Sequence, residues 1–375
     1  MPAALKGRAR RLTRADADTF SPALPQGLGE RVVQWQAAHG RHGLPWQGTR
    51  DPYRVWLSEI MLQQTQVATV LGYYGRFLER FPDVRALAAA PLDDVLALWS
   101  GLGYYSRARH LHRCAQQVVA VHAGQFPTDS AALATLPGIG RSTAAAIAAF
   151  CFGERVAILD GNVKRVLTRT LGFGGDLTDA AQERSLWDRA QALLPAQGIE
   201  SYTQGLMDLG AQVCTLRRPA CLMCPLAPDC VARAQGKPES YPVKTRRLKR
   251  GRREHALLWL VQDGRVWLHQ RPPRGVWAGL WSLPDWPDLA ALRALVGTWP
   301  GAGRELAAVE HALTHFDWTL RPLHWELPPA LPPSEQAALE AQLPAGGRWH
   351  TRAQALAAGL PAPVRKLLLA QSLRT

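Results

Sequence analysis

The chain has 375 residues, 47% of them hydrophobic, and 44 lysines and arginines against 30 aspartates and glutamates, which gives a formal net charge of +14. This length exceeds one ordinary core, so we expect two domains joined by a linker, and no apolar run is long enough to cross a bilayer. The positive charge favours a polyanionic partner, most simply nucleic acid, although a generic basic protein would have the same charge.

The first residues, 1–25, are basic and contain no apolar segment of the kind that follows the charges in a secretory signal. This pattern predicts a disordered basic tail. From residue 26 to 235 apolar residues recur mostly at helical spacing, so we predict a mainly helical domain there. Residues 236–253 have many basic side chains and no apolar face, which predicts a linker, either a solvated tether or a segment that lies along a phosphate backbone.

The last part of the chain, 254–375, has a different pattern. Two alternating runs within 255–272 are joined by Asp263 and Gly264, a strong signal for a β-hairpin. The segment 313–327 predicts another pair of strands, and 288–297 and 337–343 predict short helices. We therefore expect a small α+β domain.

Four cysteines lie within seventeen residues near the end of the helical domain: Cys214, Cys221, Cys224 and Cys230. Four thiolates so close in sequence suit one metal centre, and a disulfide framework is not expected without a secretory signal. Structural zinc usually joins two Cys-x-x-Cys hooks, and only one is present. The spacing of this loop, 214–230, therefore favours a [4Fe–4S] cluster, with zinc as the alternative.

A glycine-containing turn, "LPGIG" at 136–140, precedes an alanine-rich helix within the predicted helix-hairpin-helix segment 129–152. Gly138 and Gly140 allow the backbone N–H groups to approach a phosphate, and the dipole of the following helix favours an anion. A turn that only connects two structural helices is the alternative.

Two carboxylates stand in different settings. Glu59 lies among apolar residues in "VWLSEIML", and Asp160 directly precedes a helix in "ILDGNVKRV". An exposed helix glutamate and a helix N-cap are the simplest interpretations. If Glu59 is buried instead, its pKa rises and it becomes a candidate general acid. Two carboxylates in unlike environments can break a glycosidic bond through an oxocarbenium-like state.

Taken together, the cysteine spacing, "LPGIG", "LDGNVKRV" and "LSEIMLQQTQV" resemble the helix-hairpin-helix DNA glycosylases that carry an iron–sulfur cluster. Residues 44–67 and 99–111 narrow the resemblance to the MutY-type adenine DNA glycosylases. It is dense over residues 30–230 and looser over 254–375. The resemblance implies a mainly α helix-hairpin-helix glycosylase domain with a [4Fe–4S] cluster loop, followed by a small α+β Nudix-like domain.

The resemblance also implies functions for individual residues. Glu59 matches the general acid that protonates the adenine, Asp160 the carboxylate that stabilises or traps the sugar cation, and Asn162 a supporting active-site residue. Gln64 and Tyr104 match side chains that fill or wedge the duplex where the adenine is flipped out. Among the DNA-binding residues we also count those of the hairpin turn: Leu136, Gly138 and Gly140.

Ser142 lies on the first turn of the helix that follows the hairpin turn. Related glycosylases that also cut the backbone, such as endonuclease III, have a lysine there whose amine forms a Schiff base with the sugar. Serine cannot do so, and we therefore expect a monofunctional enzyme that leaves an intact abasic site. Lys164, near the "DGN" loop, could form an adduct as a side reaction.

The Nudix-like region in this family recognises 8-oxoguanine opposite the adenine. The family's reader triplet is Phe-Ser-His, and the chain has Leu313, Thr314 and His315, so that a hydroxyl is kept and an aromatic is lost. The several glutamates of the Nudix metal-binding helix are missing from 287–297, which argues against pyrophosphatase activity.

The expected partner is double-stranded DNA with an A:8-oxoguanine or A:G mismatch, bound by a monomer in the bacterial cytoplasm, in association with the nucleoid and not with a membrane. The alternatives are a bifunctional pyrimidine glycosylase/lyase and a non-catalytic DNA-binding or electron-transfer module with an iron–sulfur cluster. Ser142 and the second domain argue against the former, and the two carboxylates against the latter.

Overall fold

A computed structural model describes residues 24–245 and 249–370. Nearly all of the predicted basic tail (1–25) and residues 246–248 of the predicted linker lie outside the described residues. The described chain forms two compact units. The first contains its residues up to Glu59, with Pro127–Thr135 and Ile139–Arg247, and the second contains Ile60–Phe126, Leu136–Gly138 and the chain from Leu248 onwards.

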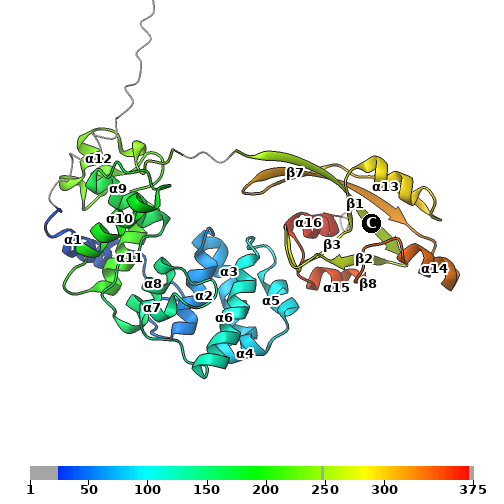
Figure 1. Ribbon diagram of the computed structural model, residues 1–375, viewed down its shortest axis with the longest axis horizontal. Coiled ribbons are helices and arrows are strands. Elements are labelled where there is room, and N and C mark those ends of the chain that lie inside the picture. The colour runs from blue at the N-terminus through cyan, green and yellow to red at the C-terminus, as the bar shows by residue number, and fades with distance from the viewer. Residues whose placement is uncertain (1–23, 246–248, 371–375) are drawn as a thin grey trace, which may run out of the picture. The chain divides into compact units, whose positions relative to one another are not determined.

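The region 26–235 is helical (Figure 1), as its periodicity predicts, and the short 3₁₀ helix η4 (Pro238–Ser240) lies within the segment predicted as a linker. No helix in the described part of the chain is long and apolar enough to cross a membrane. The helices are α1 (Leu28–His39), α2 (Pro52–Leu62), α3 (Val67–Arg80), α4 (Val84–Ala89), α5 (Leu92–Trp99), α6 (Ser106–His122), α7 (Ser130–Leu133), α8 (Arg141–Phe152), α9 (Gly161–Leu171), α10 (Ala180–Ala192), α11 (Ile199–Asp208), η1 (Leu209–Val213), η2 (Cys221–Met223), η3 (Ala227–Asp229), α12 (Val231–Ala234) and η4 (Pro238–Ser240).

The core of the first unit is built around α9. One face of this helix buries Val163, Val166 and Leu167 against apolar residues of α1, α8, α10 and α11. Cys151, on α8, is also buried, and so is Cys114, on α6 in the second unit, as expected for ordinary core residues. Because α9 is fixed along this face, both its N-terminus and its exposed side have defined positions.

The C-terminal part forms an eight-stranded mixed sheet with the order β3-β2-β1-β7-β5, while β4, β6 and β8 pair with β1, β7 and β2. Its strands are β1 (Gly251–Gln262), β2 (Arg265–Gln270), β3 (Trp281–Ser282), β4 (Asp285–Trp286), β5 (Ala302–Glu305), β6 (Val309–Ala312), β7 (Phe316–Glu326) and β8 (Gly347–Thr351), and its helices are α13 (Leu289–Val296), α14 (Pro333–Glu340), α15 (Arg352–Ala357) and α16 (Ala362–Ala370).

The predicted β1–β2 hairpin, with its turn at Asp263 and Gly264, is confirmed. The sheet packs against α13 and α14 through a buried cluster that includes Leu258, Leu292 and Leu339.

The pair of strands predicted within 313–327 is wrong, because this segment forms one long strand, β7, parallel to β1 (Figure 1). Pro322 does not interrupt β7. On the side away from β1, the partner changes there from β6, which pairs with residues 317–320, to β5, which pairs with 323–326. A proline that lacks an N–H is tolerated where the ladder changes partner.

Strand β1 begins at Gly251, so that residues 251–253 of the segment predicted as a linker pair with the start of β7. A parallel register of eleven residue pairs extends the sheet to this point.

Candidate active site and cluster loop

Glu59 lies on α2 between side chains that have almost no contact with solvent, Trp56, Leu57 and Ile60. Glu59 itself keeps a little solvent contact, yet its burial raises the pKa from 4.5 to about 7, and the negative charge of Asp160 adds to the effect. The pKa thus rises as expected for a buried glutamate. A carboxyl group with such a pKa holds a transferable proton near neutral pH.

Asp160 is the N-cap of α9, and its Oδ1 accepts a hydrogen bond of 2.7 Å from the N–H of Val163. Burial raises the pKa of Asp160, while the N–H groups of Val163 and Asn162 and the charge of Arg165 act in the opposite direction. The capping interpretation is therefore correct, and it is compatible with a chemical function. The N-terminus of α9 stabilises the ionised carboxylate that a sugar cation requires.

Ser142 lies on the first turn of α8, and its Oγ accepts a hydrogen bond of 3.0 Å from the N–H of Leu159. Because Leu159 precedes Asp160, this bond attaches α8 to the segment that carries the second carboxylate. Lys164 forms an ion pair with Glu183 through its Nζ. The nearby amine is thus engaged as an ammonium donor.

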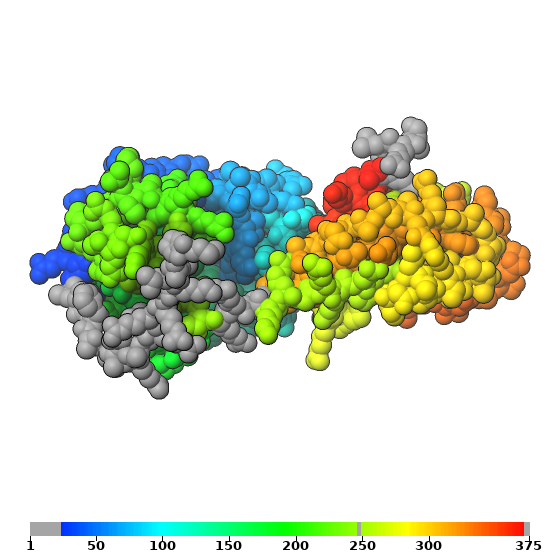
Figure 2. Space-filling model, turned by 90° about the horizontal axis from the view of Figure 1, so that it is seen from above, coloured from blue at the N-terminus to red at the C-terminus, as the bar shows by residue number. Residues whose placement is uncertain are grey.

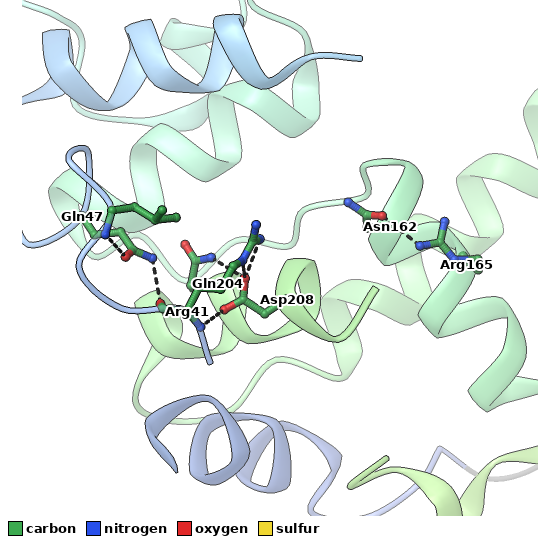
Figure 3. Close-up of polar contacts among 7 residues, drawn as sticks. Arg41, Gln47, Asn162, Arg165, Gln204 and Asp208 are labelled. Atoms are coloured by element: carbon green, nitrogen blue, oxygen red, sulfur yellow. Dashed lines mark hydrogen bonds and ion pairs between the residues drawn. The ribbon is translucent and has the colours of Figure 1, made fainter. Parts of the chain in front are cut away.

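Asn162 and Arg165 are joined on the surface of α9. Arg165 donates from Nη2 to Oδ1 of Asn162 at 2.9 Å (Figure 3). Its Nε donates to the carbonyl oxygen of Cys214 at 2.7 Å. The backbone of Gly210 packs so closely on Asn162 that a Cβ there would lie 2.5 Å from that of Asn162. Sequence reasoning did not select Arg165. Its signal is the spacing of three residues, which places it one helical turn after Asn162.

The four cysteines, Cys214, Cys221, Cys224 and Cys230, line one cavity together with residues of α9 and α12. Arg169 donates from Nη1 to the sulfur of Cys214 (3.3 Å) and to the carbonyl oxygen of Thr215 (2.7 Å). Burial raises the pKa of Cys224 to about 11. All four thiols are partly buried, and cysteine thiolates are the ligands that zinc and iron–sulfur centres use.

No three His, Cys, Asp or Glu side chains in the described ranges are arranged to hold a single metal ion. In a cubane cluster each thiolate binds a different iron, so wider sulfur spacing is acceptable. The four cysteines, which line one cavity, are a donor set that fits such a cluster.

The hairpin turn contains two glycines with different requirements. Gly138 has φ +78°, and a Cβ there would lie 2.6 Å from the Cβ of His110, so only glycine fits. Gly140 is the N-cap of α8 in extended conformation, and a Cβ there would meet no atom within 4 Å. Leu136 is buried and anchors the turn. The open space at Gly140, beside the N-terminus of α8, suits an approaching anion.

Gln64 and Tyr104 share an unusual backbone conformation. Gln64, between α2 and α3, has φ +58°, and Tyr104, just before α6, has φ +47°. Both are exposed, and Tyr104 keeps 46% of its surface accessible. Residues other than glycine in this region store strain, which is typical of functional positions.

Thr314 and His315 are exposed in the turn between β6 and β7, where Leu313 donates its N–H to the carbonyl oxygen of Phe316 (2.9 Å). The carbonyl oxygen of His315 accepts a hydrogen bond of 3.0 Å from the N–H of Gly251. The first residues of β1, which are exposed and basic, therefore lie beside this turn, and their yellow-green atoms are on the surface in Figure 2.

A buried ion pair was also missed by sequence reasoning. Asp208, at the end of α11, has no exposed surface and accepts hydrogen bonds from the N–H (2.8 Å) and Nε (2.6 Å) of Arg41 and from Nε2 of Gln204 (2.8 Å) (Figure 3). Gln47 donates in turn to the carbonyl oxygen of Arg41. This network attaches the loop after α1 to α11. Its signal in the sequence is an aspartate in the apolar run "GLMDLG".

Comparison with known proteins agrees with this geometry. Residues 57–192 match the HhH-GPD superfamily of base excision DNA repair proteins, and residues 255–370 match the NUDIX domain. A thermostable thymine-DNA glycosylase of known structure is 27% identical, with a TM-score of 0.50, and the match covers 55% of this chain and 95% of that one. The fold and the site thus define a helix-hairpin-helix base excision DNA glycosylase.

Curated relatives narrow the class. The adenine DNA glycosylase of Buchnera aphidicola subsp. Acyrthosiphon pisum is 38% identical over 261 residues, which cover 70% of this chain and 75% of the relative. The human adenine DNA glycosylase is 33% identical over 376 residues, with 85% and 68% covered. The chain belongs to the MutY-type adenine DNA glycosylases, which hydrolyse N-glycosidic bonds in base excision repair.

Proposed function

We propose that this protein is a monofunctional glycosylase that removes adenine opposite 8-oxoguanine or guanine. The observation that carries the proposal is the unlike pair of carboxyl groups. Glu59 has a pKa of about 7 and can donate a proton, while Asp160 lies at the N-terminus of α9, where a negative charge is stabilised.

In the proposed reaction, Glu59 donates its proton to the flipped adenine as the bond from the base to C1′ of the sugar breaks. The electron pair of that bond leaves with the adenine. Asp160 stabilises the resulting sugar cation or forms a transient ester with it. A water molecule then adds its oxygen to C1′ and gives its proton to the Glu59 carboxylate, and where the ester has formed, its bond to C1′ breaks and its electron pair returns to the carboxylate of Asp160. The products are adenine and an intact abasic site.

Two contacts support the absence of strand cleavage. Ser142 has a hydroxyl that accepts from the backbone of Leu159, and it has no amine for a Schiff base. The amine of Lys164 is held by Glu183. A reaction with water is the remaining course for the sugar cation.

Binding to the duplex is assigned to four places. The turn with Leu136, Gly138 and Gly140 and the N-terminus of α8 bind phosphate, and Gln64 and Tyr104 fill the space left by the flipped base. Thr314 and His315 read the opposite base in the Nudix-like domain, whose α13 (Leu289–Val296) has no glutamate for a hydrolase metal.

We further propose that Cys214, Cys221, Cys224 and Cys230 hold a [4Fe–4S] cluster. Bound there, the cluster supplies iron–thiolate bonds that fix the loop 214–230. Iron analysis should find about four irons per chain, with broad absorption near ~400 nm. Stoichiometric zinc without iron after anaerobic purification would contradict this assignment. We propose that the protein acts as a monomer in the bacterial cytoplasm, in association with the nucleoid.

The test is a single-turnover assay on an A:8-oxoguanine duplex, with strand breaks scored before and after alkali. Breaks in the adenine strand that need alkali are expected, and Glu59→Gln or Asp160→Asn should abolish them while duplex binding survives, because phosphate contacts dominate affinity. Breaks without alkali would show the bifunctional alternative. Binding without base release would show the non-catalytic one.

A further inference from the structure

Arg107, on the first turn of α6, is buried to 8% exposure and donates hydrogen bonds to two separate segments. One segment is the end of α2, where Nη1 donates to the carbonyl oxygens of Ile60 and Met61, each at 2.8 Å. The other is the loop before α6, where Nη2 donates to the carbonyl oxygens of Leu102 and Gly103, each at 3.2 Å. One guanidinium therefore joins two segments that are about 40 residues apart in the sequence.

The acceptors are neutral. Nη2 also donates to Oγ1 of Thr65 at 3.0 Å, and the carbonyls of Ile60 and Met61 belong to the last turn of α2, where the helix dipole is negative. Burial lowers the pKa of Arg107 to about 10, so the group remains charged at neutral pH. Burial of this cation is costly, and here it is offset by backbone carbonyls whose positions it fixes.

Arg107 contacts residues next to Gln64 and Tyr104, both of which have left-handed backbone conformations. Met61 and Thr65 lie on either side of Gln64 in the chain, and Gly103 directly precedes Tyr104. The guanidinium also lies 5.6 Å from the centre of the Tyr104 ring. A left-handed conformation at a non-glycine residue costs about 1–3 kcal/mol and persists only where its surroundings hold it.

We propose that Arg107 is the positioning residue that holds Gln64 and Tyr104 in their left-handed conformations, so that both side chains are ordered before they enter the duplex. The inference rests on the proposed function of these two residues in base flipping. Preorganisation of this kind removes an ordering cost from the flipping step and leaves the proton transfer unchanged.

Lysine cannot replace arginine in this position, because an ammonium has no planar fork that reaches carbonyls on both segments at once. Arg107→Lys is therefore the informative variant, since it keeps the charge. Arg113→Lys is the matched control, because Arg113 is exposed on the same helix.

The experiment reads flipping directly. 2-Aminopurine replaces the target adenine opposite 8-oxoguanine, and its fluorescence rises when it unstacks, without any bond cleavage. Arg107→Lys should lower the unstacked fraction and reduce single-turnover adenine release about tenfold, which corresponds to ~1.4 kcal/mol. The pH dependence of the residual release should match that of the unchanged enzyme. Arg113→Lys should behave as the unchanged enzyme, and circular dichroism should show both variants folded at the assay temperature.

A mutant cycle that combines Arg107→Lys with the paired change Gln64→Ala and Tyr104→Ala decides the mechanism. If Arg107 acts through these two residues, Arg107→Lys adds little to the loss in unstacking that the paired change causes. Additive losses, or normal unstacking by Arg107→Lys, would overturn the inference. Normal unstacking by both Tyr104→Ala and Gln64→Ala would also overturn the inference, because it would show that these two residues do not act in base flipping. Failure of the proposed glycosylase chemistry would give a different result. The unchanged enzyme would then unstack 2-aminopurine but would release no adenine.

Discussion

Replacement of Glu59 by glutamine should stabilise the protein in a pH-dependent way. The carboxyl group of Glu59 has a pKa of about 7 in the folded chain against 4.5 for an ordinary glutamate. Each pKa unit corresponds to ~1.4 kcal/mol, so this rise in the pKa of Glu59 corresponds to a loss of about 3 kcal/mol in the free energy of unfolding once the group is ionised. The figure is an upper limit, because solvent that reaches Glu59 lowers the cost of its charge.

The sign follows from proton binding. Below pH 4.5 the carboxyl group is protonated in both folded and unfolded chains, and the stability that goes with the neutral group is fully present. As the pH rises from 4.5 through 7, the unfolded chain releases its proton first, and that stability is lost. Glu59→Gln cannot ionise, so its advantage over the unchanged protein should grow across this window and level off above pH 7.

The assay is thermal unfolding at pH 5 and pH 8. At pH 8 Glu59→Gln should raise the Tm by about 5 °C, and at pH 5 by much less. Glu79→Gln, on the exposed side of α3, should leave the Tm unchanged at both values. An equal gain from Glu59→Gln at pH 5 and pH 8 would refute the reasoning, since the effect would then come from packing instead of charge. With the unchanged enzyme, single-turnover release should fall about tenfold per pH unit above pH 7.

Three further predictions concern other parts of the chain. Ser142→Lys should produce a borohydride-trapped DNA complex, which the unchanged enzyme should form weakly or not at all; strong trapping by the latter would point to Lys164. Arg41→Ala should destabilise the first unit by about 3–5 kcal/mol in denaturant unfolding, because it leaves the buried carboxylate of Asp208 without its cation; a loss below ~1 kcal/mol would contradict this. Thr314→Ala with His315→Ala should reduce the preference for A:8-oxoguanine over A:G by about 1 kcal/mol. This is the lower end of the range for a base contact, because Leu313 stands where the family has an aromatic residue. If the double variant prefers A:8-oxoguanine as strongly as the unchanged enzyme in a single-turnover comparison, the turn does not read the opposite base.

Much of this protein is determined by local sequence. Helical periodicity predicts the helices between residues 26 and 235, and alternation around Asp263 and Gly264 predicts the β1–β2 hairpin, because both patterns depend on which face of an element is buried. The candidate carboxylates are selected by the motifs that contain them, "LSEIMLQQTQV" and "LDGNVKRV", since a helix glutamate and an aspartate at an N-cap are each common on their own.

Pairing between distant segments was decided by tertiary structure alone. Local pattern predicts two strands within 313–327, whereas the parallel register with β1 keeps β7 continuous through Pro322. Arg107 and Asp208 belong to the same class, because a buried charge is tolerated only where carbonyls or an opposite charge arrive from elsewhere in the chain. The pKa of Glu59 depends in the same way on the surrounding residues that exclude water from it and on the charge of Asp160, which is about 100 residues away in the sequence. Sequence therefore determined which groups are present and which elements carry them, and the packing of those elements determined the charge and position of each group.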